Sequence, residues 1–458
     1  MNMYGASRDL NSYLDRRFQC SCGKEHYAPL KAVRIGEGAL GELPVYVKKY
    51  GFRSVCLVAD GITYRIAGRA CMELLEGAGI KAVMHTLAHL GFDEAAVGEL
   101  LIHMPMDCDL LIAVGTGAIN DLTRFFSYRT GRPFFTVATA APMDGFASGI
   151  AAIYTDNLKT TYHAAPPMVI LGDTDILKEA PYSMIAAGLG DLLGKFTCLC
   201  DWKLAHLITG EHYCPSIAEL VEGCTKNVLE HADQARERDA KVIGAIMEGL
   251  VLSGVAMSLY GNSRSASGCE HHMSHYWEMM FEQRGQRPAP HGVQVGVGAV
   301  LVLKLVEVLL RNRVDFRRAR ECAGIYDKKV WEQRIRKAYG PAAEGVIALE
   351  EKAHKNDTPG RLERIAVMEE KWPEIQSLLE ELPDSEQVIS ILKSLGAPCY
   401  PDEIGIDRKL LENTFLYCKE IRDRYTILQM VWDLGILEQL ALQVMEQVTE
   451  KRENVKIF

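Results

Sequence analysis

The sequence lacks the features that mark nucleic-acid-binding, secreted or membrane-spanning proteins. Lys and Arg number 51 against 60 Asp and Glu, the net charge is −9 and no basic run occurs, so we expect no nucleic-acid partner. The first 18 residues are charged and have no apolar core, which argues against a signal peptide. The longest apolar stretch, Val295–Leu310, is interrupted by Lys304 and Glu307. We expect this stretch to be too short to span a bilayer and to form a buried helix.

A disulfide framework is also lacking, because the 13 cysteines are odd in number and scattered. This usage is typical of reduced thiols, and we expect a cytoplasmic protein. One close group, Cys20, Cys22 and His26, has the residue types of a zinc knuckle. No second ligand pair follows at finger spacing, so the segment is predicted as a β-hairpin with a tight glycine turn. The length of 458 residues predicts two or three domains with large cores.

The N-terminal part alternates between strand-like and helix-like segments from residue 32 to residue 103. The predicted strands are Arg53–Ala59 and Lys81–Leu87, and the predicted helices are Tyr64–Ala78 and Phe92–Met104. This alternation predicts a parallel sheet with helices on both faces, and ligands bind such sheets at the carboxyl ends of the strands. Asp60 stands at one such end. It suits the ribose hydroxyls of an adenosine, where it would repel a 2′-phosphate, and it equally suits a turn or helix cap.

Two further predicted strands each end in a run of small residues. Asp109–Val114 leads into Gly115-Thr116-Gly117-Ala118-Ile119-Asn120-Asp121, and a helix is predicted over Leu122–Tyr128. Strand, glycines and helix together let backbone N–H groups approach a pyrophosphate, although an ordinary tight turn has the same pattern. Phe134–Ala138 leads into residues 139–149, which are small apart from Asp144 and a few others. Such a loop suits a bound ligand or plain close packing, and Lys159, in a possible hairpin, is a cation whose position the sequence leaves open.

After Pro181 helical patterns dominate to the end of the chain. The predicted helices are Ser183–Leu207, Ser216–Gln234, Ala240–Tyr260, Cys269–Glu282 and Val293–Arg313. Near the start of the first lies Asp191, in a glycine-rich apolar setting where a carboxylate is costly to bury unless it is paired. Lys195, four residues later, is one possible partner, and a metal ion is another.

Three histidines suggest where such a metal would bind. His271 and His275 lie four residues apart and project from one face of a helix, while His272 is rotated away from it. His291 follows a proline-rich loop and opens the next apolar helix. Converging imidazoles suggest a metal site, whereas satisfied polar residues on a helix would show the same spacing. With Asp191, the residues His271 and His291 would give three protein ligands and leave positions open for substrate.

Five motifs in this order resemble the sn-glycerol-1-phosphate dehydrogenase family. The motifs are GTGAINDLTRF, TVATAAPMDGFAS, AGLGDLLGKFTCLCDWKLA, SGCEHHMSHYWE and PHGVQVGVG. The family belongs to a superfamily with glycerol dehydrogenases, iron-dependent alcohol dehydrogenases and dehydroquinate synthases. The stretch Ala397–Leu437 is similar to the C-terminal part of bacterial members. The resemblance implies an α/β dinucleotide-binding domain over residues 1–181 and an all-α metal- and substrate-binding domain over residues 182–458, with the active site in the cleft between them.

The resemblance also implies an activity, a ligand set and a homodimer. The activity is metal- and NAD(P)-dependent interconversion of glycerol 1-phosphate and dihydroxyacetone phosphate. The implied metal ligands are Asp191, His271 and His291; the implied substrate-contacting residues are Asp144, Asp191 and His275. The implied dinucleotide-binding residues are Asp60, Gly117, Ala118, Ile119, Asn120, Asp121, Thr139, Ala140, Ala141, Pro142 and Ser148. The metal would be zinc, usual in archaeal members, or nickel, associated with bacterial ones.

Two departures from the family pattern concern the cofactor. The turn at Gly115 is GTG where many relatives have GGG, and Pro142 replaces a serine. A choice between NAD and NADP therefore does not follow from the motifs. Arg264 and Lys159 are candidates for the substrate phosphate, or else solvated surface charges. The alternative activities are a glycerol dehydrogenase or related metal-dependent alcohol dehydrogenase and, with less support, a cyclase similar to dehydroquinate synthase.

Overall fold

The computed structural model describes residues 10–88, 93–155, 158–230 and 232–450. The chain divides into two compact units, which interleave along the sequence. Unit 1 comprises Met1–Leu192 and Pro215–Ser263, and unit 2 comprises Leu193–Cys214 and Arg264–Phe458. This division differs from the single boundary expected after residue 181. The reason is that a long helix, α9 (Ala240–Tyr260), packs on the sheet: a Cβ added at Gly172 would lie 3.2 Å from Met247 of this helix.

Unit 1 is built on a six-stranded parallel sheet, as the alternating pattern predicted. The strands are β3 (Ala32–Gly36), β4 (Ser54–Ala59), β5 (Lys81–Thr86), β6 (Leu110–Gly115), β7 (Phe134–Ala138) and β10 (Val169–Asp173). Their order in the sheet is β3-β10-β7-β6-β4-β5, and every neighbouring pair is parallel. Two antiparallel hairpins accompany the sheet: β1 (Arg17–Gln19) with β2 (Glu25–Tyr27), and β8 (Ile150–Thr155) with β9 (Leu158–His163). The hairpin predicted for the Cys20 segment is thereby confirmed.

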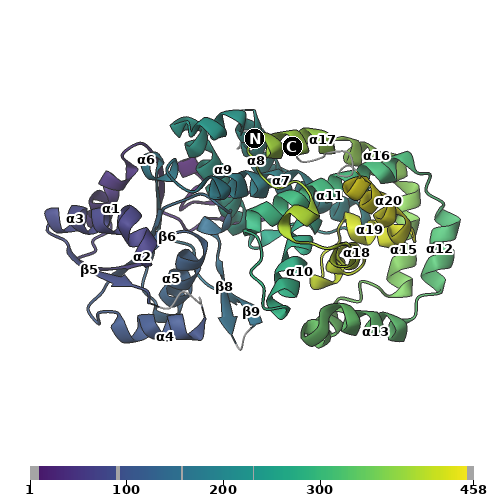
Figure 1. The fold of residues 1–458 in the computed structure, drawn as a ribbon, viewed down its shortest axis with the longest axis horizontal. Coiled ribbons are helices and arrows are strands. Elements are labelled where there is room, and N and C mark those ends of the chain that lie inside the picture. Colours follow the sequence, from purple (N-terminus) through teal and green to yellow (C-terminus); the bar gives the residue numbers. More distant parts are fainter. Residues whose placement is uncertain (1–9, 89–92, 156–157, 231, 451–458) are drawn as a thin grey trace. The chain divides into compact units, whose positions relative to one another are not determined.

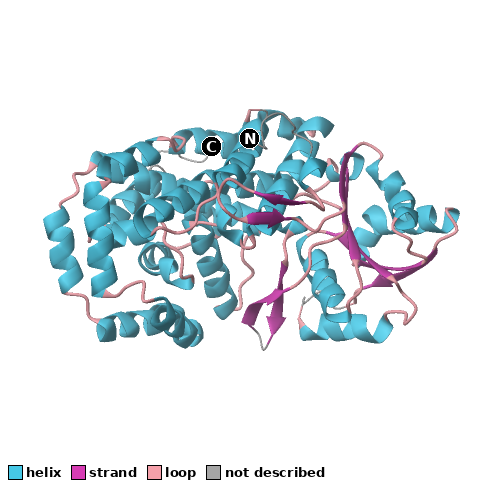
Figure 2. Ribbon diagram, turned by 180° about the vertical axis from the view of Figure 1, so that it is seen from behind, coloured by secondary structure: helices cyan, strands magenta, loops and turns pink. Residues whose placement is uncertain are grey.

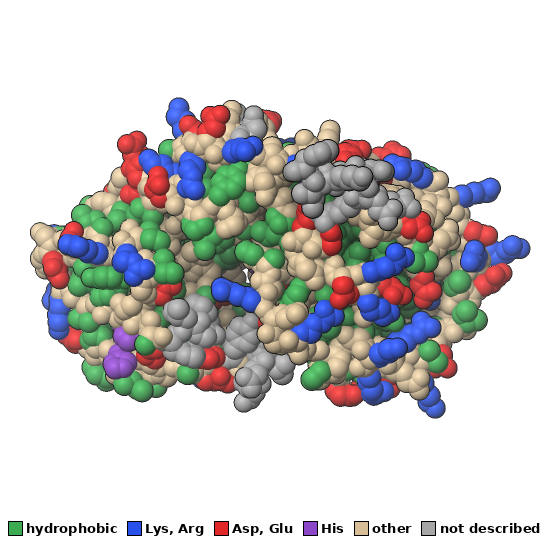
Figure 3. All heavy atoms as spheres, in the orientation of Figure 1, with side chains coloured by type: hydrophobic (Ala, Val, Ile, Leu, Met, Phe, Trp, Pro, Cys, Tyr) green, Lys and Arg blue, Asp and Glu red, His purple; other side chains and the backbone are tan. Residues whose placement is uncertain are grey.

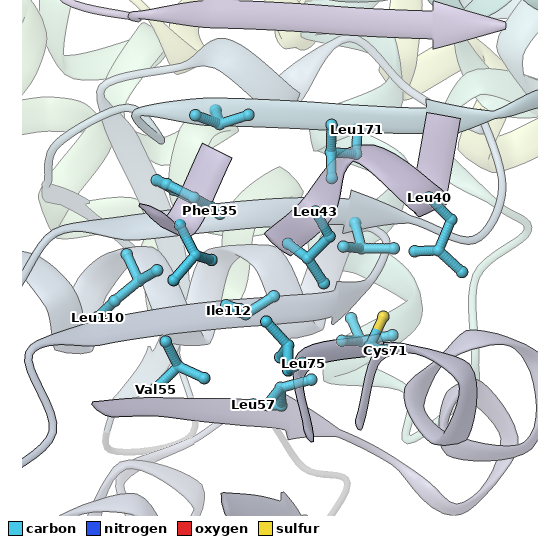
Figure 4. Close-up of a cluster of buried hydrophobic side chains, with 14 of the residues drawn as sticks. Leu40, Leu43, Val55, Leu57, Cys71, Leu75, Leu110, Ile112, Phe135 and Leu171 are labelled. Atoms are coloured by element: carbon cyan, nitrogen blue, oxygen red, sulfur yellow. The ribbon is translucent and has the colours of Figure 1, made fainter. Parts of the chain in front are cut away.

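Helices cover both faces of this sheet (Figure 1). The helices of unit 1 besides α9 are α1 (Leu43–Lys49), α2 (Gly61–Thr63), α3 (Arg69–Gly77), α4 (Glu94–His103), α5 (Gly117–Thr130), α6 (Thr174–Leu177), α8 (Pro215–Leu229) and the first part of α7 (Tyr182–Thr209). Alternate side chains of β4 enter different cores, because successive residues of a strand point to opposite faces. Val55 and Leu57 pack with α1 and α3 (Figure 4), whereas Cys56 and Val58 pack with α4 and α5.

Unit 2 is helical throughout its described residues (Figure 2). Besides the end of α7, its helices are α10 (Cys269–Gln283), α11 (His291–Arg311), α12 (Phe316–Gly324), α13 (Lys328–Tyr339), α14 (Ala343–Ala353), α15 (Thr358–Glu370), α16 (Trp372–Glu380), α17 (Ser385–Ser394), α18 (Arg408–Tyr417), α19 (Ile427–Asp433) and α20 (Leu437–Glu450). Glycine lets the two central helices come close, since a Cβ at Gly298 of α11 would lie 2.8 Å from the Glu270 carbonyl oxygen of α10.

Three helices, α7, α9 and α11, are long and apolar enough to cross a membrane by length and composition. The expectation that the apolar stretch in α11 is too short was therefore wrong. The expectation that it is buried is confirmed: 89% of the most apolar window of α11 lies inside the protein, as does 83% of the corresponding window of α9. Burial within the fold accounts for the apolar character of these helices.

Charged side chains of both signs are dispersed over the face drawn in Figure 3, where Lys and Arg lie among Asp and Glu. This distribution agrees with the mild net charge of the chain and shows no extended basic surface on that face.

Candidate active site

The turn after β6 brings a helix N-terminus to the carboxyl end of the sheet in unit 1. The helix α5 begins at Gly117, earlier than the predicted Leu122, so that Gly117, Ala118 and Ile119 form its first turn. Gly115 has no room for a side chain, because a Cβ would lie 2.8 Å from Ile119 Cδ1. The N-cap Thr116 makes no side-chain capping hydrogen bond. An N-terminus of this kind presents backbone N–H groups and a positive dipole end to an anion.

Asp60 directly follows β4 and caps the short helix α2. Its Oδ1 accepts hydrogen bonds from Ile62 N at 2.8 Å and Thr63 N at 2.7 Å, and Thr63 Oγ1 accepts one from Asp60 N. This reciprocal pair confirms the capping interpretation of Asp60. Its predicted contact with the cofactor ribose is a separate role and stays a prediction.

A buried arginine, which the sequence reasoning missed, organises the loop of small residues. Arg124 on α5 donates to Asp121 Oδ1 at 2.7 Å, to the Phe146 carbonyl at 2.9 Å and to the Ile150 carbonyl at 2.8 Å. Asp121 also accepts from Ala152 N at 3.2 Å. Asp121 therefore anchors the β8 strand to α5. The surrounding loop packs closely, with Thr139, Ala140, Ala141 and Ser148 buried.

Asn120 is also committed to the fold, since it is fully buried and its Oδ1 accepts from Thr136 Oγ1 at 2.7 Å. Ser148 Oγ accepts from Ile150 N at 3.2 Å, and Pro142 is half-buried. These hydrogen bonds give Asn120 and Ser148 a structural role that does not require a bound ligand. The cofactor contacts expected for residues 117–121, 139–142 and 148 stay a prediction.

Two predicted substrate-contacting carboxylates come together within unit 1. Asp144 N donates to Asp191 Oδ2 at 2.9 Å, and Asp144 Oδ2 accepts from Ser253 Oγ at 2.9 Å. Asp191 is fully buried on α7. Glycine makes the approach possible, because a Cβ at Gly188, one turn earlier, would lie 2.1 Å from the Ala141 carbonyl oxygen. The glycine-rich helix start is thus explained by close packing of α7 on the loop.

Within unit 2, the three predicted histidines converge. The ring centroids lie 5.2 Å apart for His271 and His291, 5.5 Å for His275 and His291, and 6.2 Å for His271 and His275. His271 is buried, whereas the side chains of His275 and His291 remain 32% and 28% exposed. His272 is directed away into the core and is fully buried, as its helical position requires.

Two carboxylates that sequence reasoning missed hold the histidines by their Nδ1 atoms. His271 Nδ1 donates to Glu270 Oε1 at 2.7 Å, and His291 Nδ1 donates to Glu278 Oε1 at 3.2 Å. Glu278 Oε2 lies 3.4 Å from His275 Nδ1. A carboxylate on Nδ1 fixes the tautomer in which Nε2 carries the lone pair, which is how metal-binding histidines are commonly held. The donor chemistry of this cluster therefore fits a divalent metal bound through Nε2.

Glu270 is kept ionised although it is buried. Burial opposes ionisation, but the hydrogen bond from His271, together with hydrogen bonds from Thr197 Oγ1 at 2.6 Å and Gly268 N at 2.7 Å, holds the pKa of Glu270 below its ordinary value. The only sequence signals for Glu270 and Glu278 were their spacings from the histidines, one residue before His271 and three after His275.

Of the two candidates for the substrate phosphate, Arg264 is held inside unit 2, and Lys159 stays a prediction. Arg264 is buried rather than at the surface, and it donates to Glu211 Oε1 at 2.9 Å, to the Asp201 carbonyl at 3.1 Å and to the Tyr425 carbonyl at 2.7 Å. It therefore ties segments of unit 2 together. The Lys159 side chain lies outside the described residues.

The fold and this set of residues define a class of protein. The sequence model of the iron-containing alcohol dehydrogenases matches residues 34–181. Among solved structures, the fold is similar to glycerol dehydrogenase from Schizosaccharomyces pombe, with a TM-score of 0.60 at 15% identity over 94% of this chain and 93% of that one. It is also similar to sulfoacetaldehyde reductase from Bifidobacterium kashiwanohense in complex with NAD+, with a TM-score of 0.59 at 12% identity over 92% of this chain and 98% of that one. At these identities the likeness concerns the fold.

Sequence relatives are more specific. A glycerol-1-phosphate dehydrogenase [NAD(P)+] from Geobacillus stearothermophilus is 32% identical over 92% of this chain and 97% of its own. The enzymes of that name from Halalkalibacterium halodurans and Thermococcus kodakarensis are 38% and 35% identical, over 65% and 60% of this chain and 76% and 77% of theirs. The chain belongs to the glycerol-1-phosphate dehydrogenase family.

Proposed function

We propose that this protein is a metal- and NAD(P)-dependent dehydrogenase that interconverts sn-glycerol 1-phosphate and dihydroxyacetone phosphate by hydride transfer at C2. Family membership supports the choice of substrate. The convergence of His271, His275 and His291 is the observation that supports metal-assisted dehydrogenation. A purely structural cluster of histidines would not need two buried carboxylates on their Nδ1 atoms with two of the rings still partly exposed.

We propose that Asp191, His271 and His291 hold one divalent metal, zinc or nickel. The bound metal supplies Lewis-acid polarisation of the substrate C2 oxygen and lowers the pKa of the C2 hydroxyl in the oxidative direction. Asp144, which donates its backbone N–H to Asp191, orients that carboxylate. Glu270 and Glu278 orient the two imidazoles. Imidazole and carboxylate ligands suit both metals, so the donor set does not choose between them.

His275 is the proposed proton-relay residue. The surrounding protein removes much of the water around the His275 ring and lowers its pKa to about 4, and the Glu278 carboxylate opposes this only in part. The ring is therefore neutral near pH 7, with a lone pair available to accept the proton released when the C2 hydroxyl is oxidised. Its partial exposure gives that proton a route to solvent, and its neighbours are the two proposed ligand rings.

The dinucleotide is proposed to bind at the carboxyl end of the sheet in unit 1, with its pyrophosphate at the N-terminus of α5. A nicotinamide bound there would supply hydride-transfer chemistry, and the turn after β6 and the first turn of α5 would hold the dinucleotide. A cation for the substrate phosphate is available in unit 2 at Arg422, an exposed residue whose positive charge contributes to lowering the pKa of His275. This residue replaces Arg264 as the proposed phosphate anchor.

The experiment that tests this function compares phosphorylated with unphosphorylated substrate. Metal-stripped protein is reloaded with Zn²⁺ or Ni²⁺, and NADH and NADPH oxidation is followed with dihydroxyacetone phosphate and with dihydroxyacetone. We expect kcat/KM to be larger for the phosphorylated ketone by a factor of ten or more. A preference for dihydroxyacetone would instead favour a glycerol dehydrogenase, the activity named for the S. pombe structure. A cyclase would show no net change in NADH absorbance, and no oxidation under any metal loading would refute the proposal.

A further inference from the structure

The N-terminal hairpin carries a thiol–imidazole group that the proposed reaction does not use. Cys20 directly follows β1, Cys22 lies in the turn, and His26 is in β2. The turn is closed by hydrogen bonds from Gly23 N to the Cys20 carbonyl and from Cys20 N to the Lys24 carbonyl, both at 3.0 Å. Gly23 adopts φ +86°, which an L side chain rarely does, so the glycine permits the turn that brings the cysteines toward His26.

A fourth donor comes from a residue far away in the sequence. Cys214 directly precedes Pro215, the first residue of α8. The Sγ atoms of the three cysteines and a ring nitrogen of His26 all lie within 4.8 Å of one another. Two donors on a tetrahedral zinc at about 2.3 Å for sulfur and about 2.0 Å for nitrogen stand about 3.5–3.8 Å apart. The separations therefore need to close by no more than about 1 Å.

The imidazole is already oriented as a ligand. His26 is 1% exposed, and its Nδ1 donates to the Leu259 carbonyl at 2.8 Å, near the C-terminal end of α9. That bond places the proton on Nδ1 and leaves Nε2 as the atom with a lone pair. Nε2 lies 3.3 Å from Cys22 Sγ, close to the separation of two ligands on one zinc ion. A backbone carbonyl on the other ring nitrogen is a usual support for a zinc-binding histidine.

We propose that Cys20, Cys22, His26 and Cys214 form a structural zinc site of Cys3His composition, separate from the catalytic metal. Four protein ligands leave no position for substrate, and His26 and Cys214 are buried, as expected of a closed site. The site would fasten the β1–β2 hairpin to the end of α9 and the start of α8. It explains why these thiols gather on a short hairpin for which no second ligand pair follows at finger spacing. The inference does not depend on the proposed activity.

Cobalt substitution distinguishes this site from the catalytic one in the full-length protein. The metal-stripped chain is reloaded with Co²⁺, and its near-ultraviolet absorption is recorded. Thiolate ligands give a sulfur-to-cobalt charge-transfer band, which a site of one carboxylate and two imidazoles does not give. We expect this band in the wild type and in the His291→Ala variant, which lacks a proposed catalytic ligand. Absence of the band in the wild type would overturn the proposal, and this result needs no variant to fold.

Variants then locate the ligands. Cys22→Ser should weaken the band by at least the share of one thiolate, bind zinc less tightly and melt at a lower temperature, while kcat per folded molecule changes less than twofold. Cys224→Ser, a half-buried cysteine of α8 outside the group, is the matched control and should keep the band. His26→Cys, which preserves four donors, should also keep it. A Cys22→Ser variant with unchanged cobalt absorption and unchanged zinc content would refute the site.

Discussion

The two units prepare their parts of the proposed site in different ways. In unit 1 the cofactor region is shaped by backbone: a glycine turn, the first turn of α5 and a loop of small buried residues held by Arg124. In unit 2 the metal region is shaped by side chains, three imidazoles and two carboxylates on α10 and α11. The comparison teaches that single substitutions among these unit 2 side chains, or at Asp191, the proposed metal ligand from unit 1, should remove chemistry. In the cofactor region of unit 1, single substitutions should mainly alter how the cofactor is held.

The largest effect is expected from removing a proposed metal ligand. His271→Ala and His291→Ala should each lose bound metal and activity while the fold survives, because three ligands become two. Elemental analysis and circular dichroism test this expectation. His354→Asn, at an exposed histidine with φ +50° that asparagine tolerates, is the control and should keep both metal and activity. Full metal occupancy in both alanine variants would contradict the ligand assignment.

A smaller loss is expected at His275, where ligand and relay roles separate. His275→Ala should keep its metal and its NAD affinity and lose about 10²–10⁴ in turnover, the usual magnitude of general acid–base help. Single-turnover hydride transfer and metal content are measured on the one variant. Loss of the metal would instead make His275 a ligand. The geometry would allow this role, because one donor atom each of His275, Glu278 and His291 lie within 4.8 Å of one another. Unchanged hydride transfer would make it structural.

Glu278 should act on the metal through the rings it holds. Glu278→Gln keeps the size of the side chain but removes the charge and one acceptor, so we expect a metal dissociation constant about 10–100-fold higher. Competition with a chromophoric chelator measures this constant without reference to activity. Glu282→Gln, one turn further along α10, is the matched control. Equal metal dissociation constants for Glu278→Gln and Glu282→Gln would show that the His291–Glu278 contact does not affect metal binding.

The phosphate preference should weaken when the proposed anchor is neutralised. Arg422→Gln should raise KM for dihydroxyacetone phosphate about tenfold or more, since a charge-assisted hydrogen bond contributes about 1.5–3 kcal/mol. The KM for dihydroxyacetone should hardly change, which makes the unphosphorylated ketone the internal control. A parallel increase for both substrates would show that Arg422 supports the site without binding phosphate.

The smallest effect is expected in unit 1, at Asp60. Asp60→Asn keeps an N-capping side chain and removes the charge that would repel a 2′-phosphate, so it separates the two roles of this residue. The preference for NAD over NADP should narrow, with little change in melting temperature. Asp60→Gly, which removes both the capping side chain and its charge, should also narrow the preference for NAD over NADP. If the wild type and both variants discriminate equally, Asp60 acts only as a cap.

Sequence periodicity predicted the sheet well because β4, β6 and β7 are continuous apolar runs that end at turn residues. The sequence also predicted the convergence of His271, His275 and His291. Helix geometry places the first two on one face of α10, and the third begins α11 after a proline-rich loop. It missed Arg124, Glu270 and Glu278, whose importance lies in what they contact rather than in their spacing. It likewise misjudged Arg264, since nothing in a local pattern shows that an arginine is buried by carbonyl groups distant in the sequence.

Pre-steady-state hydride transfer tests the central claim most directly. Metal-stripped wild-type protein and its His291→Ala variant are mixed with NADH and dihydroxyacetone phosphate, before and after reloading with Zn²⁺ or Ni²⁺. The wild type should oxidise one NADH per chain in the first turnover only after reloading, and the variant should remain inactive in both states. Equal hydride transfer by stripped and reloaded wild type would contradict the proposal that a metal held by Asp191, His271 and His291 activates the C2 oxygen.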